Sequence, residues 1–198
     1  MKASAIILAG GKSSRMGSNK ALLEFNNKTN IERIKDEMSG FAEVILVTNE
    51  PETYKFLGLK TVSDEYPGLG PLAGIHAGLM ASASEINILV ACDMPFVTSD
   101  LAAALVEKAG SYDAVVPVIE GRQHPLFAVY RKSIISRIEE CLNNKNLRIK
   151  HLLESLNVLY LNDRDFQAYN SESLDRIFYN MNHPEEYENA KKWAEAKE

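Results

Sequence analysis

Glycines and cations alternate near the start of the chain, where residues 8–25 read LAGGKSSRMGSNKALLEF. Glycine lets the backbone approach a ligand closely and adopt positive φ, so that successive N–H groups can point at phosphate oxygens. Arg15 can bind a phosphate through two hydrogen bonds, and Lys20 supplies a point charge. The segment predicts a polyphosphate-binding loop around Gly10 and Gly11, although its spacing matches neither a P-loop nor a Rossmann fingerprint. An ordinary surface loop with solvated cations is the alternative.

An acidic residue follows the apolar run INILVA, in the sequence CDMP at residues 92–95. In an open α/β sheet, a carboxylate at the carboxyl end of a strand lies on the side where ligands bind. Mg²⁺ prefers oxygen ligands and often takes one or two carboxylates together with substrate phosphates. We therefore predict Asp93 as a Mg²⁺ ligand. A helix-capping role is the alternative, but Thr98 and Ser99 already supply caps for the next helix.

Two loops offer further polar groups. Asp64 precedes a glycine- and proline-rich loop, YPGLGPLAGI, whose backbone would let a flat base or sugar lie against it; a flexible connector is the alternative. The sequence GRQHP at residues 121–125 precedes a strand and could face a second substrate. A lone histidine such as His124 is more often structural than catalytic. No zinc site is expected, because paired ligands are lacking near His76, His151 and His183.

The elements that must position these residues alternate between short β-branched runs and helical periodicities. The runs predict strands at 4–8, 43–48, 86–91, 113–117, 126–130 and 158–161. Periodicity and caps predict helices at 30–39, 98–109, 133–142 and 182–196, and one more ending near residue 81. This alternation is typical of a three-layer, Rossmann-like α/β fold with a mostly parallel sheet. The strand at 126–130 has little room for a crossover helix before it, so we expect it to pair antiparallel.

Length and composition limit the class of protein. The 198 residues suit a single domain, 1–198, and 45% hydrophobic with 25% charged residues is ordinary for a globular chain. The formal charge of −5, from 22 basic and 27 acidic residues, argues against nucleic acid or membrane partners, so any anion must be bound by local groups. The apolar runs are too short to span a membrane. Cys92 and Cys141 lack metal-ligand spacing and indicate a cytoplasmic protein.

Five motifs, in this order, resemble the molybdenum cofactor guanylyltransferases, which are small MobA-type nucleotidyltransferases: LAGGKSSRMGSNK, GPLAGI, CDMP, GRQHPLFAVY and FYNMNHPEE. They run from residue 8 to residue 186 and so cover nearly the whole chain. The first motif alone is shared by many nucleotidyltransferases, and the combination points to the molybdopterin branch. The resemblance implies the nucleotide-diphospho-sugar-transferase type of α/β fold. It also implies transfer of GMP from GTP to the phosphate of molybdopterin, with release of pyrophosphate, in molybdenum cofactor biosynthesis.

The resemblance assigns roles by matching positions. GTP would lie against a backbone cradle of Leu8, Ala9, Gly10 and Gly11, with its phosphates near Lys20, its nucleoside near Asn49 and Asp64, and Asp93 shared with Mg²⁺. The pterin side would comprise Arg122, His124, Arg148, Asn180 and Asn182. One departure is Asn19, because the family usually has Asp directly before the lysine. The negative charge that could pair with Arg15 or Lys20 is therefore missing.

The implied chemistry is an in-line attack of the molybdopterin phosphate on the α-phosphorus of GTP. A phosphate nucleophile is already ionised at neutral pH, so no strong base and no covalent enzyme intermediate are required. Catalysis would rest on positioning and electrostatics, with Arg15 and Lys20 stabilising the leaving pyrophosphate and Asp93 holding Mg²⁺.

Three alternatives remain open at the level of sequence. A cytidylyltransferase for the same pterin is the nearest, although those relatives tend to carry Ala where this chain has Gly10, which favours GTP. A sugar-phosphate nucleotidyltransferase is the second. The third, from another class, is a non-catalytic nucleotide-binding protein that delivers cofactor. Molybdoenzymes or their chaperones are further partners that the resemblance implies.

Overall fold

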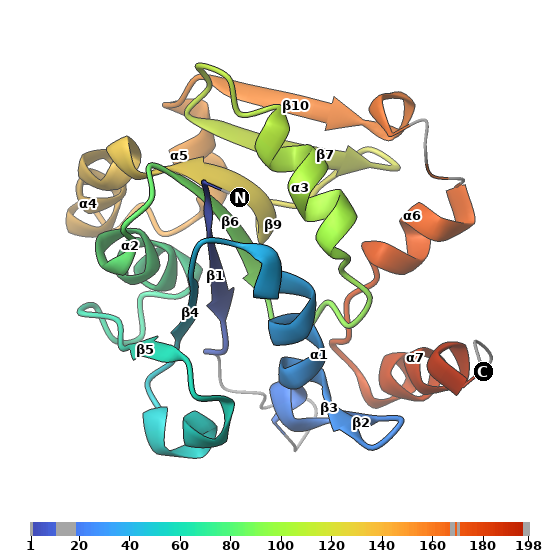
Figure 1. The fold of residues 1–198 in the computed structure, drawn as a ribbon. Helices are drawn as coiled ribbons and strands as arrows, with labels where there is room; N and C mark the ends of the chain where they lie inside the picture. The colour runs from blue at the N-terminus through green and yellow to red at the C-terminus, as the bar shows by residue number, and fades with distance from the viewer. Residues whose placement is uncertain (1, 11–18, 167–168, 170, 196–198) are drawn as a thin grey trace.

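Eight strands form the central sheet of the computed structural model, which describes residues 2–10, 19–166, 169 and 171–195 (Figure 1). Their order across the sheet is β10-β7-β9-β6-β1-β4-β5, with β8 paired to β7. The strands are β1 (Ser4–Leu8), β4 (Val44–Val47), β5 (Lys60–Val62), β6 (Ile86–Ala91), β7 (Ala114–Ile119), β8 (Arg122–Gln123), β9 (Phe127–Arg131) and β10 (Val158–Asn162). All six predicted strands are present, with ends shifted by one residue or so.

The sheet is mostly parallel, as predicted. β1 pairs parallel with both β4 and β6, β4 with β5, and β7 with β10. β9 is antiparallel to β6 and to β7, which confirms the expectation for the strand at 126–130. β1, β4, β5, β6, β7 and β10 therefore end on the same side of the sheet. We call this side the carboxyl edge.

β1 shows why the strands read as unbroken apolar runs. All five of its residues are buried. Ala5 and Ile7 belong to the hydrophobic core on one face of the sheet, whereas Ile6 and Leu8 belong to the core on the other face. Because successive side chains of a strand point to opposite faces, a strand covered by helices on both sides must be apolar at every position.

Helices cover both faces of the sheet and complete the three layers (Figure 1). One face carries α1 (Asn30–Glu37), α3 (Ser99–Glu107) and α6 (Ser171–Ile177). The other carries α2 (Pro71–Ala81), α4 (Ile135–Asn143) and α5 (Ile149–Glu154). The side chain of Thr98 accepts a hydrogen bond from Leu101 N at the start of α3, so the predicted cap is confirmed. Short 3₁₀ helices are η1 (Lys20–Leu22), η2 (Met38–Gly40), η3 (Pro51–Leu57), η4 (Lys132–Ile134) and η5 (Asp163–Asp165).

The last helix, α7 (Pro184–Glu195), packs away from the sheet, against a small hairpin of β2 (Glu24–Phe25) and β3 (Lys28–Thr29) (Figure 1). Their contact is a separate apolar cluster of Phe25, Phe96, Met181, Ala190 and Ala194. The hydroxyl of Tyr187 also donates to Glu24 O over 2.9 Å. The C-terminal helix is thus fastened to the segment that follows the predicted phosphate loop.

Several elements differ from the prediction. The hairpin and helices α5 and α6 were not expected, because each is too short to show a clear period. The predicted helix 182–196 starts at Pro184, since proline fits the first turn of a helix but not its interior. The predicted helix 30–39 ends in the 3₁₀ turn η2. In the part of the chain that the structure describes, none of the helices combines the length and apolarity needed to cross a membrane.

Candidate active site

The predicted nucleotide residues lie where neighbouring parallel strands end. Ala9 and Gly10 follow β1, Asn49 follows β4, Asp64 follows β5, and Asp93 follows β6. Backbone hydrogen bonds hold these ends in register, including Ala9 N to Val47 O at 2.9 Å. Leu8 is the last residue of β1, and only 8% of its surface is exposed. The carboxyl edge therefore brings together residues that are far apart in the sequence, as a ligand site in this type of sheet requires.

Asn49 and Asp64 form a reciprocal pair. The amide of Asn49 donates to Asp64 Oδ2 over 2.7 Å, and Asp64 N donates to Asn49 Oδ1 over 3.1 Å. The second carboxylate oxygen, Asp64 Oδ1, is buried without a hydrogen-bond partner among the described residues. The pair fixes the orientation of Asp64 and leaves one acceptor unused, which suits a hydroxyl or N–H donor of a ligand.

Two hydrogen bonds fix the backbone at Cys92 and Asp93. The amide of Asn30, fully buried, donates to Cys92 O over 2.7 Å, and Met181 N donates to Asp93 O over 2.8 Å. Burial raises the pKa of the Asp93 carboxyl, an effect that the Lys20 charge opposes. Asp93 Oδ1 is buried and has no hydrogen-bond partner in the described part of the chain. A desolvated carboxylate oxygen of this kind is costly unless a cation or donor completes it.

Lys20 stands at the first position of η1, which Asn19 caps. Asn19 Oδ1 accepts from Ala21 N over 3.1 Å, and its amide donates to the hydroxyl of buried Tyr54 over 2.9 Å. The side chain of Lys20 reaches across the site and donates to Asn182 Oδ1 over 2.8 Å. The missing aspartate is thus replaced by an amide that orders the turn through two neutral hydrogen bonds. Gly11 and Arg15 lie outside the described residues.

A cavity of about 510 Å³ opens beside Asp93, between the ends of β7 and β9 and the segment before α7. Four of the five predicted pterin-side residues line it, namely Arg122, His124, Asn180 and Asn182. Arg148 is the exception: it is exposed at the start of α5, and its neighbour Ile149 lines the cavity instead. The separation arises because a helix begins at Arg148 and turns successive side chains to different directions.

His124 lines this cavity and packs against an aromatic side chain. Its ring lies 4.6 Å from that of Phe178, centroid to centroid, and its backbone N donates to Pro117 O over 2.9 Å. Burial, assisted by the charge of Arg122, lowers the pKa of His124 to about 4. The imidazole is therefore neutral at physiological pH and can hydrogen-bond a ligand without adding positive charge.

Several residues that shape the site had no role assigned to them from the sequence, although some lie in the motif FYNMNHPEE. Phe178 and Tyr179 form an aromatic wall of the cavity, and Glu186 lines it as well. Asn30, which supports the Asp93 loop, is expected from the sequence only as the first residue of the helix predicted at 30–39. A polar residue at a helix start is an ordinary feature, so nothing in its local sequence shows that it is fully buried or that it contacts a strand end far along the chain.

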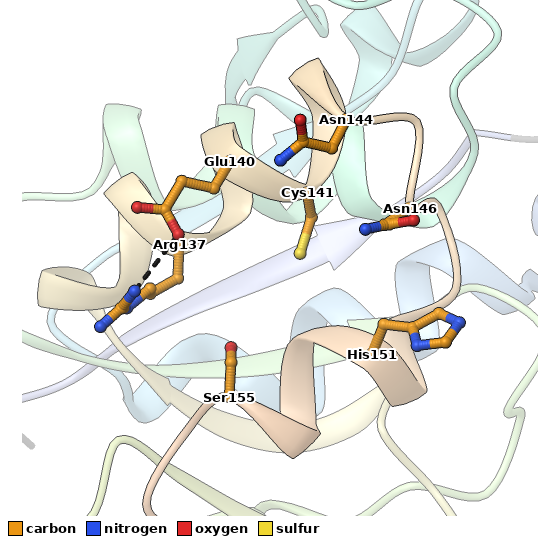
Figure 2. Close-up of a pocket in the computed structure, with 7 residues that line it drawn as sticks. All are labelled: Arg137, Glu140, Cys141, Asn144, Asn146, His151 and Ser155. Carbon is orange, nitrogen blue, oxygen red and sulfur yellow. Dashed lines mark hydrogen bonds and ion pairs between the residues drawn. The ribbon is translucent and has the colours of Figure 1, made fainter.

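A second cavity, of about 250 Å³, lies between α4 and α5, on the face of the sheet that also carries α2 (Figure 2). The thiol of Cys141 points into it, and Arg137 is paired with Glu140 over 3.2 Å (Figure 2). Both cysteines are free thiols. None of the predicted site residues lines this cavity. Among the residues that the structure describes, no group of three or more histidine, cysteine or acidic side chains is arranged to hold a metal ion.

Comparisons with known proteins identify the family to which the chain is similar. The family model described as "MobA-like NTP transferase domain" matches residues 5–159. A probable molybdenum cofactor guanylyltransferase of Clostridium perfringens strain 13 is 39% identical over 190 residues, covering 95% of this chain and 96% of the relative. One of the same name from Pelotomaculum thermopropionicum is 38% identical over 196 residues, covering 98% and 95%.

A solved structure extends the likeness to three dimensions. The molybdopterin-guanine dinucleotide biosynthesis protein A of Archaeoglobus fulgidus superposes with a TM-score of 0.84 at 28% identity, covering 98% of this chain and 99% of the other. The α/β architecture is that of nucleotidyltransferases of the nucleotide-diphospho-sugar-transferase fold, as predicted.

Proposed function

The chain belongs to the MobA-like NTP transferase family, and we propose that it transfers GMP from GTP to the phosphate of molybdopterin, releasing pyrophosphate. The observation that carries the proposal is the meeting of Lys20 and Asp93 between two different recognition regions. On one side are the strand ends with Asn49 and Asp64, and on the other is the cavity lined by Asn182. A transferase that joins two substrates needs its charged groups at such a junction.

Asp93 fits a divalent metal, and we propose Mg²⁺. Its Oδ1 is a buried, hard oxygen acceptor without a partner among the described residues. A single protein carboxylate suits Mg²⁺, which often completes its octahedral shell with substrate phosphates and water. When bound, the ion would neutralise phosphate charge and act as a Lewis acid.

The remaining steps belong to the protein's own residues. Lys20 would stabilise the charge that gathers on pyrophosphate as it leaves, and Arg15 would add to this from the loop. The backbone cradle of Leu8, Ala9, Gly10 and Gly11 would bind GTP at the end of β1, while the Asn49–Asp64 pair would contact the nucleoside. No proton has to be removed from the attacking phosphate, because phosphate is ionised at neutral pH.

The cavity is the proposed place of molybdopterin. Its volume of about 510 Å³ suits a cofactor-sized ligand, and its aromatic wall of Phe178 and Tyr179 suits a flat ring system. Arg122 would face the anionic groups, with His124 and Asn180 supplying neutral hydrogen bonds. We propose a cytoplasmic setting, which the two free thiols support, and molybdoenzymes or their chaperones as recipients.

A pyrophosphate-release assay with purified protein, molybdopterin and Mg²⁺ tests the proposal, with GTP and CTP compared side by side. We expect turnover with GTP and at least about 10-fold less with CTP, since a site that hydrogen-bonds one base rejects another strongly. Faster turnover with CTP would replace the guanylyl assignment by a cytidylyl one. Turnover with a sugar 1-phosphate in place of molybdopterin, or binding of GTP without any pyrophosphate release, would contradict the proposal.

A further inference from the structure

Residues 181–186 connect the C-terminal helix with both charged groups of the site. Met181 N donates to Asp93 O over 2.8 Å, and the next side chain, Asn182, accepts from Lys20 Nζ over 2.8 Å. Lys20 is therefore oriented by an amide oxygen. A neutral acceptor directs the ammonium group while leaving its positive charge available to a phosphate, whereas a carboxylate there would neutralise it.

Glu186 fixes the backbone that carries this amide. Its Oε2 accepts from the backbone N–H of Asn182 and, over 2.8 Å, from that of His183. These are the N–H groups at the entrance to α7, where a negative charge is also favoured by the helix dipole. One carboxylate oxygen thus closes the turn that aims the side chain of Asn182 at Lys20.

The turn packs against the hairpin of β2 and β3. Tyr187, next to Glu186, packs edge-on against Phe25 at 5.4 Å between ring centroids and donates to Glu24 O. Buried Met181 belongs to the same apolar cluster as Phe25. Because α7 is anchored on the hairpin that follows η1, the segments carrying Lys20 and Asn182 share one support.

We propose that Glu186 is a positioning residue, which holds the Asn182 backbone so that its amide orients Lys20 toward the nucleotide phosphates. The inference deepens the proposed function and depends on it, since it gives Lys20 the task assigned above. Glu186 acts through Asn182 and makes no hydrogen bond to Lys20 that the structure shows.

Steady-state kinetics of three variants test the proposal. Glu186→Ala should lower kcat for GTP by about 10- to 100-fold with little change in KM, because a misplaced catalytic group costs rate more than binding. Glu186→Gln keeps an acceptor oxygen and should recover most of the rate. Glu185→Ala is the matched control, since Glu185 is exposed in the same first turn of α7. Its kcat should equal that of the unaltered protein.

A double-mutant cycle separates positioning from a general structural effect. If Glu186 acts through Asn182, the variant with both Glu186→Ala and Asn182→Ala should be no slower than Asn182→Ala alone. Multiplication of the two losses, or unchanged kcat in Glu186→Ala, would overturn the proposal.

A spectroscopic readout distinguishes failure of this inference from failure of the proposed function. In protein carrying ¹³C-labelled lysine, the Lys20 Cε resonance, assigned with Lys20→Arg, should shift in Glu186→Ala and stay in place in Glu185→Ala. This holds whether or not GTP is turned over. Absence of turnover in the unaltered protein would overturn the function alone, whereas an unmoved Lys20 resonance in Glu186→Ala would overturn the positioning role.

Discussion

The two recognition regions of the molecule are built in opposite ways. The nucleotide side, at the ends of β1, β4 and β5, consists of backbone and of one exposed polar pair, Asn49 with Asp64. The acceptor side is a cavity with an aromatic wall, a neutral histidine and walls from five separate stretches of chain. Strand ends place polar groups by topology alone, while a cavity requires side-chain packing. The first design suits the phosphates and sugar common to all nucleotides, and the second suits one particular partner.

Lys20 and Asp93 are the two charged groups that we propose to serve both regions, and the charge of Lys20 acts on the Asp93 carboxyl. Asp93 comes from the sheet, and its backbone is held by Met181 from the acceptor side. Lys20 comes from the loop after β1 and contacts Asn182, also on the acceptor side. The junction therefore couples the regions through hydrogen bonds that neither region makes alone. Loss of a residue at the junction should cost more than loss of a residue in either region.

The largest expected effect is at Asp93, because this residue lies at the junction between the nucleotide side and the acceptor side. Asp93→Asn should lower pyrophosphate release by at least about 100-fold, because the carboxylate is the group that Mg²⁺ and charge stabilisation require. The folded protein should be no less stable, since burial raises the pKa of Asp93 and the neutral amide avoids that desolvation cost. Turnover and urea unfolding of the same preparation measure both, with exposed Asp100→Asn as the control. Near-normal turnover would remove Asp93 from the mechanism.

A smaller effect is expected where α2 supports the nucleotide side. A Cβ at Gly78 would lie 2.4 Å from Ile6 Cγ2 in the core beneath β1, so Gly78→Ala must displace the helix. Overpacking costs about 1–3 kcal/mol, offset by about 1 kcal/mol of helix propensity, so we expect a net loss of up to about 2 kcal/mol in the free energy of unfolding. The KM for GTP should rise as well.

Gly74→Ala is the matched control on the same helix. Its Cβ would meet Leu8 Cδ2, the far end of a flexible side chain, at 3.2 Å, which a small rotation relieves. Because the same gain in helix propensity then meets a smaller clash, urea unfolding should show Gly74→Ala to be at least as stable as the unaltered protein and more stable than Gly78→Ala. An equal loss in both variants would show that close packing of α2 on β1 is not what limits substitution at Gly78.

The same contrast explains what could be predicted from the sequence. Asp93 follows a recognisable strand directly, so it could be placed at the carboxyl edge without any tertiary information, whereas Asp64 follows β5, a strand that the sequence did not predict. The acceptor side depends on contacts such as that between His124 and Phe178, which are far apart in the chain and leave no periodic signal. Arg148 shows the limit, because the family resemblance gave the residue but not its exposed place at the start of α5, outside the cavity lining.

Long-range hydrogen bonds of buried amides were equally beyond prediction. Asn30 reads as a residue at a helix start, and only the fold shows that its side chain supports Cys92 O at the end of β6. Asn19 is the converse case. The sequence suggested a lost ion pair, whereas the structure shows an amide that caps η1 and binds Tyr54. The charge of a residue is evident from the sequence, but its hydrogen-bond partner is known only from the folded structure.

The smallest expected effect is a pH dependence confined to the acceptor side. Burial lowers the pKa of His124 from 6.5 to about 4, so between these values the unfolded chain binds a proton that the folded protein does not. Above pH 6.5 the residue contributes no difference, and as the pH falls from 6.5 toward 4 it destabilises the folded state. His124→Gln should therefore lose less of its unfolding free energy than the unaltered protein between pH 7 and pH 4.5.

Other titrating groups near His124 also change the free energy of unfolding with pH. The contribution of His124 is therefore the difference between the pH dependence of His124→Gln and that of the unaltered protein. Arg122 adds to the shift, and the acidic side chains Glu120, Asp175 and Glu186 line the same cavity. If His124→Gln keeps the pH dependence of the unaltered protein, then His124 is protonated as readily in the folded as in the unfolded protein. In that case the imidazole would gain a charge as the pH falls through 6.5, and the contrast with the nucleotide side would rest on the aromatic wall alone.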